Sequence, residues 1–576
     1  MEKNLLPIAV ANARPNPDLY NHQGWDTQFQ NCFFEVYQDA QTETQKVFCV
    51  KRPGVSSSNA WSAGTFPNGH TTGYALGCFT AQPHTSIKIY FGVYGASSGL
   101  AHLYYFDGTT VTGFGSHSMP TYKRINFVDV GLPNDTYTVG WTAGANLYLV
   151  KDAGVIANST PHSSAWVTAT AYSIGGTVLN AGTHYTCIVE HTSGTFANDL
   201  ASGYWVVSSS PDLTRPVYMN NRVFVGDRVT GNIIQSGLGT YSTFSQSEYI
   251  VAESYGGKLV DLGRYNNFIV AFKEFSMEFF EDVANQNGTV LGRVGQAEQQ
   301  VGCVHPNTIV DTGAGELVWL STDRSGHRSI KMLSNSFQCD DIADAFLSKM
   351  LNLTTSYDGS YAFLLNANGH QFYILTLKQN YTDSSNSADF ANITYAYDLK
   401  TKLWTLWTTP TESVTFTDSA SGATITTVGR WNYAGACVNL YNTTLVQEYD
   451  TGVLHVLDDY ICQDKGVAIQ FIMQLSNVDF GTNKRKFLNR LSLYADSKNL
   501  TTLEFLLYLI RNDFNTTPSD QRPLVSYSAD NDTAFATFAL GSGKKFTIKI
   551  TSTSNTPIRV SAINIDYDIG EGHGIS

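Results

Sequence analysis

Short apolar runs separated by polar turns recur along most of this chain. Six segments share one plan, in which an apolar strand, a polar or glycine-containing turn and a second strand with aromatics follow one another. They read AHLYYFDGTTVTGF from 101, NRVFVGDRVTGNIIQ from 221, NFIVAFKEFSMEFF from 267, ELVWLSTDRSGHRSIKML from 316, YAFLLNANGHQFYILTL from 361 and YAYDLKTKLWTLW from 395. In five of them the turn contains Asp-Gly, Thr-Gly, Ser-Gly, Asn-Gly or Asp-Leu-Lys-Thr, which forbids a continuous helix. The pattern predicts β-hairpins.

The stretch 265–282 is ambiguous by its own pattern. Its four phenylalanines have the spacing of one apolar helix face, at Phe268, Phe272, Phe275 and Phe279. The runs FIVAF and MEFFE could equally be two strands that flank a turn at Lys273-Glu274. Because the neighbouring segments carry hairpin chemistry, we expect a hairpin here too.

One segment, QCDDIADAFLSKMLN at 338–352, is predicted to be helical. Asp340 or Asp341 can cap its first turn, and Ile342, Phe346 and Met350 fall on one face. A short helix beside many hairpins is expected to connect the sheets and pack on them.

The spacing of the hairpins predicts an all-β fold with a β-propeller-like core. The middle segments begin at 221, 267, 316 and 361, which are 46, 49 and 45 residues apart. Spacing in the forties is typical of a four-stranded propeller blade, although a β-sandwich could also give hairpins at intervals. Two regions break the plan, and they predict a small inserted β module and a C-terminal β-sandwich-like domain. The expected organisation is an N-terminal arm at 1–30, a core at 31–158 and 208–465, the module at 159–207 and the C-terminal domain at 466–576.

The composition agrees with this fold and limits the chemistry. Only 15% of the residues are charged, below the roughly 25% of ordinary soluble domains, and 32 Tyr and 32 Phe are present. The formal net charge of −13 argues against tight binding of DNA, which requires Lys and Arg at the phosphates, but it allows DNA to slide past. The eight cysteines include no C-x-x-C pair, so we expect buried, reduced thiols and neither zinc nor disulfides. No secretion signal or membrane span is evident, which predicts synthesis in a cytoplasm.

Motifs for catalysis and cofactor binding are weak. The sequence STDRSGHRS at 321–329 resembles the S-x-D-x-G-x-x-W turn of sialidase propellers, but Gly326 comes one residue late and the Trp is missing. A glycosidase would also need a pair of carboxylates at a defined separation. No nucleophile elbow, H-E-x-x-H, P-loop or G-x-G-x-x-G occurs in a suitable setting. We therefore expect no catalytic residues, no metal and no cofactor.

A basic cluster lies in DFGTNKRKFLNRLSLYA near the start of the C-terminal region. Its members are Lys484, Arg485, Lys486 and Arg490. They could form a solvated strand end, or they could contact an acidic surface of a neighbouring subunit. The net charge makes duplex DNA the least favoured partner.

The segment 160–207 resembles the small chitin-binding-type carbohydrate modules attached to chitinases. The resemblance rests on an opening Trp166, a Y-x-x-G-x-x-V run from Tyr172, a G-x-x-Y-x-C run through Tyr185 and a closing Trp205. Gly176 replaces the usual Asp of that family. The resemblance implies that Trp166, Tyr172, Tyr185 and Trp205 bind sugar, whose C–H faces stack on aromatic rings. Alternatively, these aromatics form the core of a tiny domain with little else to bury.

Five further motifs, in order, resemble the tail nozzle proteins of short-tailed phages, also called packaged-DNA stabilisation or tail tubular B proteins. They are VFCVKRPGV at 47–55, RPVYMNNRVFVGD at 215–227 with FIVAFKEFSMEFFED at 268–282, VGCVHPNTIVDTGAGELVWLSTDRSG at 301–326, YAYDLKTKLWTLW, and DFGTNKRKFLNRLSLYA. The inserted segment is not universal in that family.

This resemblance implies a structural, non-enzymatic virion protein of the phage tail. It would form a homo-oligomeric ring, usually of six copies, below the portal and the tail adaptor protein, and it would also meet tail fibre or spike proteins. Duplex DNA would pass through the lumen without specific binding, and packaged DNA would be retained until ejection. The alternatives are a tail adhesin that binds a host surface glycan and, less favoured, a propeller glycosidase.

Overall fold

A computed structural model of the chain describes most of the residues outside the longer loops. The described residues are 2–6, 28–38, 45–59, 66, 73–81, 87–130, 137–151, 156–285, 287–334, 336–344, 347–348, 351–352, 354, 356–377, 393–410, 413–417, 424–438, 442–496, 504–511, 520–527 and 534–570. Most of the predicted N-terminal arm, at 7–27, lies outside them.

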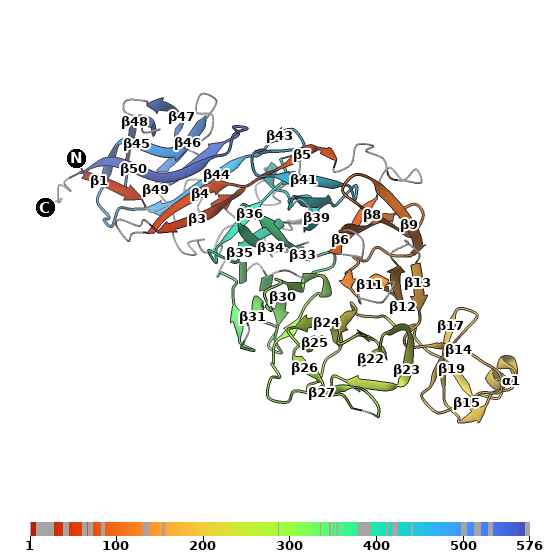
Figure 1. Ribbon diagram of the computed structural model, residues 1–576. Coiled ribbons are helices and arrows are strands. Elements are labelled where there is room, and N and C mark those ends of the chain that lie inside the picture. The colour runs from red at the N-terminus through yellow and green to blue at the C-terminus, as the bar shows by residue number, and fades with distance from the viewer. Residues whose placement is uncertain are drawn as a thin grey trace.

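Within the described residues, six separate sheets and one end of a 15-stranded sheet form the blades of a β-propeller, and the blades are numbered here along the chain (Figure 1). Blade 1 is β6 (Tyr74–Ala81), β7 (Lys88–Gly95), β8 (Leu100–Phe106) and β9 (Val111–Ser118). Blade 2 is β10 (Val128–Asp129), β11 (Tyr137–Ala143), β12 (Asn146–Lys151) and β13 (Ile156–Ser159). Blade 3 is β20 (Val217–Met219), β21 (Arg222–Gly226), β22 (Asn232–Gly237) and β23 (Thr240–Val251). Blade 4 is β24 (Leu259–Tyr265), β25 (Phe268–Lys273), β26 (Met277–Asp282) and β27 (Leu291–Arg293).

The remaining three blades complete the ring. Blade 5 is β28 (Gly302–Cys303), β29 (Val310–Asp311), β30 (Leu317–Thr322), β31 (Arg328–Leu333) and β32 (Cys339–Asp341), with a short 3-10 helix at Pro306–Thr308. Blade 6 is β33 (Tyr361–Ala367), β34 (His370–Leu377), β35 (Ile393–Asp398) and β36 (Trp404–Trp407), followed by the hairpin of β37 (Ser413–Thr417) and β38 (Thr424–Val428). Blade 7 is β39 (Tyr433–Val438), β40 (Thr444–Glu448), β41 (Leu454–Asp458), β5 (Gly54–Asn59), β42 (Gln463–Asp464) and β43 (Val467–Ala468).

The ring is closed, because a hydrophobic cluster lies between every two neighbouring blades, blades 7 and 1 included. In the closing cluster, Phe91 of blade 1 packs with Leu445 of blade 7. Blade 7 also combines distant parts of the chain, since β5 pairs with β41 at Val55 and Leu457. This pairing of an N-terminal strand with a late strand completes blade 7.

All six predicted hairpins are confirmed, including the ambiguous one at 265–282. There, β25 pairs with β26 in antiparallel register, Val270 opposite Phe279. Phe272 and Phe279 are both fully buried between blades 4 and 5, while Phe268 lies partly buried at the edge of the same cluster. Phe268, Phe272 and Phe279 thus serve packing between blades 4 and 5, and the helical spacing of the four phenylalanines is coincidental.

The helix predicted at 338–352 is wrong at its start. Residues Cys339–Asp341 form β32, which pairs with β31. Helical structure is described only at 347–348 and 351–352, where the Asp344 carboxylate accepts a hydrogen bond from the backbone N–H of Leu347 at 2.7 Å. Asp344 is therefore the capping residue. Asp340 and Asp341 cannot cap the helix, because they lie on β32 at the edge of blade 5.

A second β domain contains both the first and the last of the described strands (Figure 1). Its late strands are β44 (Phe471–Val478), β45 (Lys486–Asp496), β46 (Phe505–Arg511), β47 (Asp520–Tyr527), β48 (Ala534–Gly543), β49 (Phe546–Ser552) and β50 (Arg559–Ile569). They are joined by β1 (Glu2–Leu6), β2 (Gln28–Gln30), β3 (Cys32–Gln38) and β4 (Gln45–Lys51). These strands enclose one hydrophobic core.

The structure differs from the predicted boundary at 31, where the propeller core was expected to begin. Strands β3 and β4 belong to the C-terminal domain instead, since β4 pairs with β50 at Cys49 and Val560. Phe34 and Cys49 are buried in its core. The aromatic and β-branched residues of CFFEVYQ and QKVFCVK predict strands, but they do not say which sheet the strands complete.

The segment that interrupts the propeller between blades 2 and 3 forms its own small sheets. Its elements are β14 (Ser164–Ala165), β15 (Ala171–Tyr172), β16 (Thr177–Asn180), β17 (Thr183–Cys187), β18 (His191–Thr192), α1 (Phe196–Ala201) and β19 (Trp205–Val207). We call residues 164–207 the inserted module. It projects from the opposite side of the propeller to the C-terminal domain (Figure 1).

Candidate functional site

Arg52 is at the centre of the joint between the propeller and the C-terminal domain. Its fully buried guanidinium binds the Asp464 carboxylate through two hydrogen bonds, at 3.1 and 2.5 Å. It also donates to the Asn31 side chain at 3.0 Å and to the Thr408 carbonyl at 2.7 Å. The rings of Trp407 and Trp431 lie 5.7 and 5.6 Å from its central carbon.

Strand β2 continues this joint as main-chain pairing. Gln30 pairs with Leu406 of blade 6 on one side and with Ile472 of β44 on the other. Asn31, in the left-handed region with a φ of 56°, donates from its amide to the Gln470 carbonyl at 2.8 Å. The propeller and the C-terminal domain therefore share a continuous sheet, which makes them one mechanical unit.

Buried charges in blades 3 to 5 are paired with one another. Asp261 accepts from Arg215 at 2.8 Å and lies 3.4 Å from Arg228. Glu278 lies 3.5 Å from Lys273 and 3.3 Å from Arg293. Because each carboxylate is held by two cations, these groups stabilise the packing of the blades and are poorly placed to act as acids or bases.

His305, which precedes the 3-10 helix of blade 5, has a strongly reduced affinity for protons. Its pKa is lowered to about 4, mainly by burial; Asp358 and Asp261 act against the change, and Arg228 and Arg124 contribute to it. In the folded protein this imidazole is therefore neutral near pH 7. Its Nδ1 has no hydrogen-bond partner within the described part of the chain.

The turn in STDRSGHRS is structural. The Asp323 carboxylate accepts hydrogen bonds from the backbone N–H groups of Ser325 and His327, at 2.8 and 3.1 Å. The hydrogen bond from the Ser325 hydroxyl is the main cause that lowers the pKa of Asp323. The carboxylate thus closes the turn between β30 and β31.

The four aromatic residues predicted to bind sugar all belong to the core of the inserted module. Trp205 is only 3% exposed and packs edge-on against Tyr172, with ring centroids 5.0 Å apart. Trp166 and Tyr185 are partly buried and both contact Phe196, at 5.6 and 4.7 Å. Trp205 cannot stack on a ligand from this position, whereas the other three rings keep part of their surface in solvent.

A side chain of blade 3 binds the inserted module directly. The Gln246 side chain of β23 binds both backbone groups of Thr177, accepting at 3.2 Å and donating at 2.9 Å. Next to this contact, the buried His184 ring lies 2.8 Å from the Ser163 hydroxyl. Burial lowers the pKa of His162 and of His184, and the nearby Asp227 partly offsets this in each case.

The predicted basic cluster does not act as one surface. Lys486 is buried, and its ammonium group donates to the carbonyls of Thr482 and Lys544. Arg490 lies over the Phe538 ring, 5.5 Å from its centroid. Lys484 and Arg485 are exposed. Only these two are placed to meet another subunit directly.

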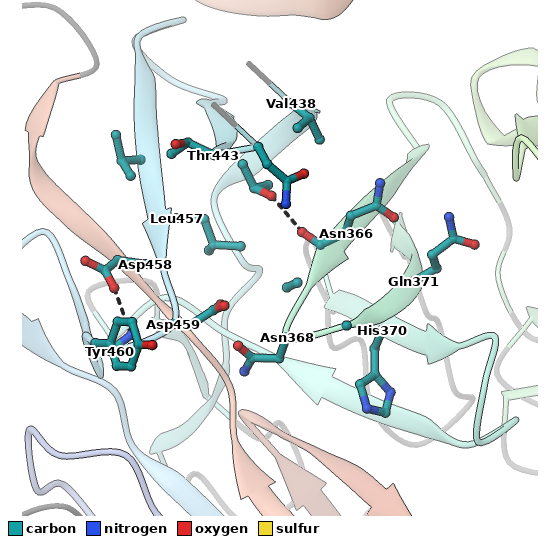
Figure 2. A pocket seen from close by; sticks show the side chains of 15 residues that line it. Asn366, Asn368, His370, Gln371, Val438, Thr443, Leu457, Asp458, Asp459 and Tyr460 are labelled. Carbon is teal, nitrogen blue, oxygen red and sulfur yellow. Dashed lines mark hydrogen bonds between the residues drawn. The ribbon is translucent and has the colours of Figure 1, made fainter. Parts of the chain in front are cut away.

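A pocket of about 670 Å³ opens between blades 6 and 7 (Figure 2). Asn366, Asn368 and Gln371 from the hairpin of β33 and β34 form one wall. The opposite wall is the Asp458-Asp459-Tyr460 turn after β41. Val438 and Leu457 supply apolar surface between these walls, and Thr443 and Thr444 supply hydroxyl groups. Sequence reasoning missed this pocket, because its walls come from segments about 90 residues apart.

The polar groups of this pocket are held in place by neighbouring hydrogen bonds. The Asp458 carboxylate accepts from the backbone N–H of Tyr460 at 2.8 Å, and the Thr444 hydroxyl donates to the Asn366 carbonyl at 2.8 Å. The His370 ring is turned away from the pocket toward Asp398, whose carboxylate lies 2.8 Å from its Nδ1. Partial burial raises the pKa of Asp459, and the adjacent Asp458 raises it further.

Among the described residues, no group of three or more His, Cys, Asp or Glu side chains could hold a metal ion. The eight cysteines are free thiols, six of them buried. None of the described helices has the length and apolar character needed to cross a bilayer.

Comparison with known families links the propeller to phage tails. Residues 133–390 match the family model described as "Bacteriophage P22 Gp10, beta-propeller". The matched range begins before β11 of blade 2 and ends between β34 and β35 of blade 6. The match supports a structural protein of the tail of a short-tailed phage, located in the virion and assembled with other tail proteins. No curated protein matches the chain by sequence.

Similar solved structures are remote. The WD40 domain of Neurospora crassa Pan2 is 8% identical, with 67% of this chain and 89% of that chain covered and a TM-score of 0.33. A glycoside hydrolase family 43 arabinoxylan arabinofuranohydrolase from Bacillus subtilis is 9% identical, with 87% and 96% covered and a TM-score of 0.23. The N-terminal domain of Nup159 is 11% identical, with 75% and 99% covered and a TM-score of 0.28. At these TM-scores the likenesses carry no inference about function.

Proposed function

We propose that this chain is the nozzle subunit of a short-tailed phage tail. Six copies form a ring below the portal and the adaptor, enclose the DNA channel, retain packaged DNA and conduct it during ejection. The observation that carries the proposal is the match of residues 133–390, from β11 of blade 2 to β34 of blade 6, to the phage P22 Gp10 propeller. The Arg52 joint adds support, because a channel wall under load requires its domains to move as one body.

The charge of the chain suits a passage for DNA. A net charge of −13 repels phosphates, so DNA would move past the wall without sticking. Exposed Lys484 and Arg485 would then serve contacts between subunits, where they meet acidic surfaces of the next copy. Tail fibre or spike proteins would attach on the outside of the ring.

Electron microscopy of the purified chain, alone and with the adaptor, tests this function. We expect rings with a central hole, and we expect virions assembled without the protein to lose their DNA. Particles that remain monomeric in both samples would contradict the ring. Charge reversal at Lys484 and Arg485 together should weaken the ring, whereas reversal of the exposed Lys258 and Arg324, far along the chain in blades 4 and 5, should not.

A second candidate function is binding of a host surface glycan by the inserted module. It is favoured by the partly exposed rings of Trp166, Tyr172 and Tyr185 and by the scarcity of charge, since Glu190 and Asp199 are the charged residues of 164–207 apart from histidine. A glycan array probed with the full chain should lose its signal after Trp166→Ala. Trp205→Ala is the wrong test, because Trp205 is needed for the core.

We further propose that the chain is not an enzyme. The buried carboxylates Asp261 and Glu278 are each paired with two cations, and the Asp323 carboxylate closes a turn. Incubation with polysaccharide substrates should release no reducing sugar. Measurable release that disappears in an Asp458→Asn or Asp459→Asn variant would contradict this proposal and place the chemistry in the pocket of Figure 2.

A further inference from the structure

The pocket between blades 6 and 7 has a composition that a DNA passage does not need. Its volume of about 670 Å³ falls within the roughly 300–1,000 Å³ that is usual for small-molecule sites. It is also separate from the inserted module, which interrupts the propeller between blades 2 and 3. The lining combines polar groups on two walls with apolar surface between them, as ligand sites commonly do.

One wall presents side-chain amides. Asn366, Asn368 and Gln371 come from β33, from the turn and from β34, so the hairpin sets their spacing. Asn368 lies in the left-handed region with a φ of 50°, which places it at the tip of the turn. Each amide offers a donor and an acceptor in one plane, and that combination can bind neighbouring hydroxyl groups of one ligand.

The opposite wall presents two carboxylates and an aromatic ring. Asp458 and Asp459 are acceptors for hydroxyl hydrogens, and the hydrogen bond from the Tyr460 backbone to Asp458 fixes the turn that carries them. The Tyr460 side chain is 69% exposed at the edge of the pocket, an unusual position for a large aromatic residue. Its flat apolar face can pack against C–H groups while its hydroxyl stays in water.

The charge of the lining narrows the ligand class. Among the described residues that line the pocket, none is lysine or arginine, and two are acidic. A phosphate, a sulfate or a nucleic acid would be repelled by these carboxylates. A lipid chain would leave the amides without partners. A ligand with many hydroxyl groups and an apolar ring face satisfies both walls.

We propose that this pocket binds a short neutral oligosaccharide, with one sugar ring on Tyr460 and its hydroxyl groups shared between the amide wall and the carboxylate wall. The site does not depend on the channel function or on sugar binding by the inserted module. It lies between two blades that are closed on each other, so the ligand would meet a preformed surface.

Saturation-transfer difference NMR on the full chain tests the pocket, with maltotriose and triacetylchitotriose as probes. We expect saturation to reach at least one probe, and we expect Tyr460→Ala to weaken its binding about tenfold or more, because the variant removes the ring on which the sugar packs. Asn368→Ala should weaken it less. Tyr249→Ala is the matched control, because this exposed tyrosine lies on β23 of blade 3, and it should leave binding unchanged.

Three results would overturn the proposal. The first is no saturation of either probe at millimolar concentration with the folded wild-type chain. The second is binding that survives Tyr460→Ala but disappears after Trp166→Ala, which would assign the sugar to the inserted module. The third is stronger binding of maltose 1-phosphate than of maltose, which would show a site for anions. A ring that forms normally in any of these cases leaves the nozzle function untouched.

Discussion

The C-terminal domain and the inserted module are both attached to the propeller, but their joints are of opposite kinds. The first joint buries Arg52 and Asp464 completely, places the guanidinium within 5.7 Å of the ring centres of two tryptophans and carries a shared sheet through β2. The second joint is a pair of hydrogen bonds between Gln246 and the Thr177 backbone beside two buried histidines. The first joint suits a part that bears load, and the second suits a part that can be gained or lost without disturbing the ring.

The largest effect is expected from breaking the first joint with Arg52→Ala. The change leaves the Asp464 carboxylate buried without its cation, and removal of one partner of a buried pair destabilises by about 3–5 kcal/mol. Denaturant unfolding monitored by tryptophan fluorescence should show a large drop in the midpoint. Arg324→Ala, at an exposed arginine in a blade 5 turn, should stay within about 0.5 kcal/mol of the wild type. Equal midpoints for the wild type and Arg52→Ala would refute the importance of the joint.

A comparable but local effect is expected from Trp205→Ala in the module. Loss of a buried tryptophan costs about 3–5 kcal/mol, which is more than a core of this size can supply. Hydrogen exchange should therefore become fast at 164–207, while blades 1 to 7 exchange as before. The exposed Val207→Ala on the same strand is the control. Unfolding that spreads into blade 3 would show that module and propeller are one cooperative unit.

Acid should weaken the propeller itself, through His305. Burial lowers the pKa of this histidine to about 4, below its ordinary value of 6.5, so the unfolded chain binds the proton more tightly. The contribution of neutral His305 to the free energy of unfolding is complete above pH 6.5. It is lost as the pH falls from 6.5 to 4, by about 3 kcal/mol for this one group. The free energy of unfolding, measured across this pH range, should change less with pH in His305→Gln than in the wild type. His327→Gln should keep the slope of the wild type, because His327 is exposed. An unchanged slope in His305→Gln would place the acid sensitivity elsewhere.

The two joints also differ in how far the sequence predicts them. The hairpins follow from local pattern, because alternating apolar residues and turn chemistry act within a few positions. The module is also local, since its aromatic residues lie within 45 positions of one another. The Arg52 joint is not local: its partners lie 356 and 412 residues away at Thr408 and Asp464. Nothing in K-R-P-G distinguishes an arginine that will be enclosed by tryptophans from one that faces water.

The blade count and the pocket also depend on contacts between distant parts of the chain, which local sequence patterns do not predict. Blade 7 takes its fourth strand from β5, nearly 400 positions before β41, so hairpin spacing alone could not close the ring. The pocket combines the β33–β34 turn with the turn after β41, and each turn alone has the composition of an ordinary solvated loop. The contact of the basic cluster with another subunit stays a prediction, but the sequence did not show that the cluster is divided: Lys486 begins β45 and is buried, whereas Lys484 and Arg485 precede the strand and are exposed.

The smallest effect, and the sharpest test of the second joint, is expected from Gln246→Ala. The variant removes both hydrogen bonds to Thr177, but water can replace them at this partly exposed site, so the loss is about 1–2 kcal/mol of docking free energy. The midpoint of global unfolding should not move, because the core of the module and the core of the propeller are both left intact. Limited proteolysis should instead cut faster at the connections on either side of 164–207. Gln338→Ala, an exposed-site glutamine whose side chain binds Asp340 in blade 5, is the matched control and should leave the cleavage rate unchanged. If Gln246→Ala lowers the global midpoint as Arg52→Ala does, the module is part of the load-bearing body and the two joints are of one kind.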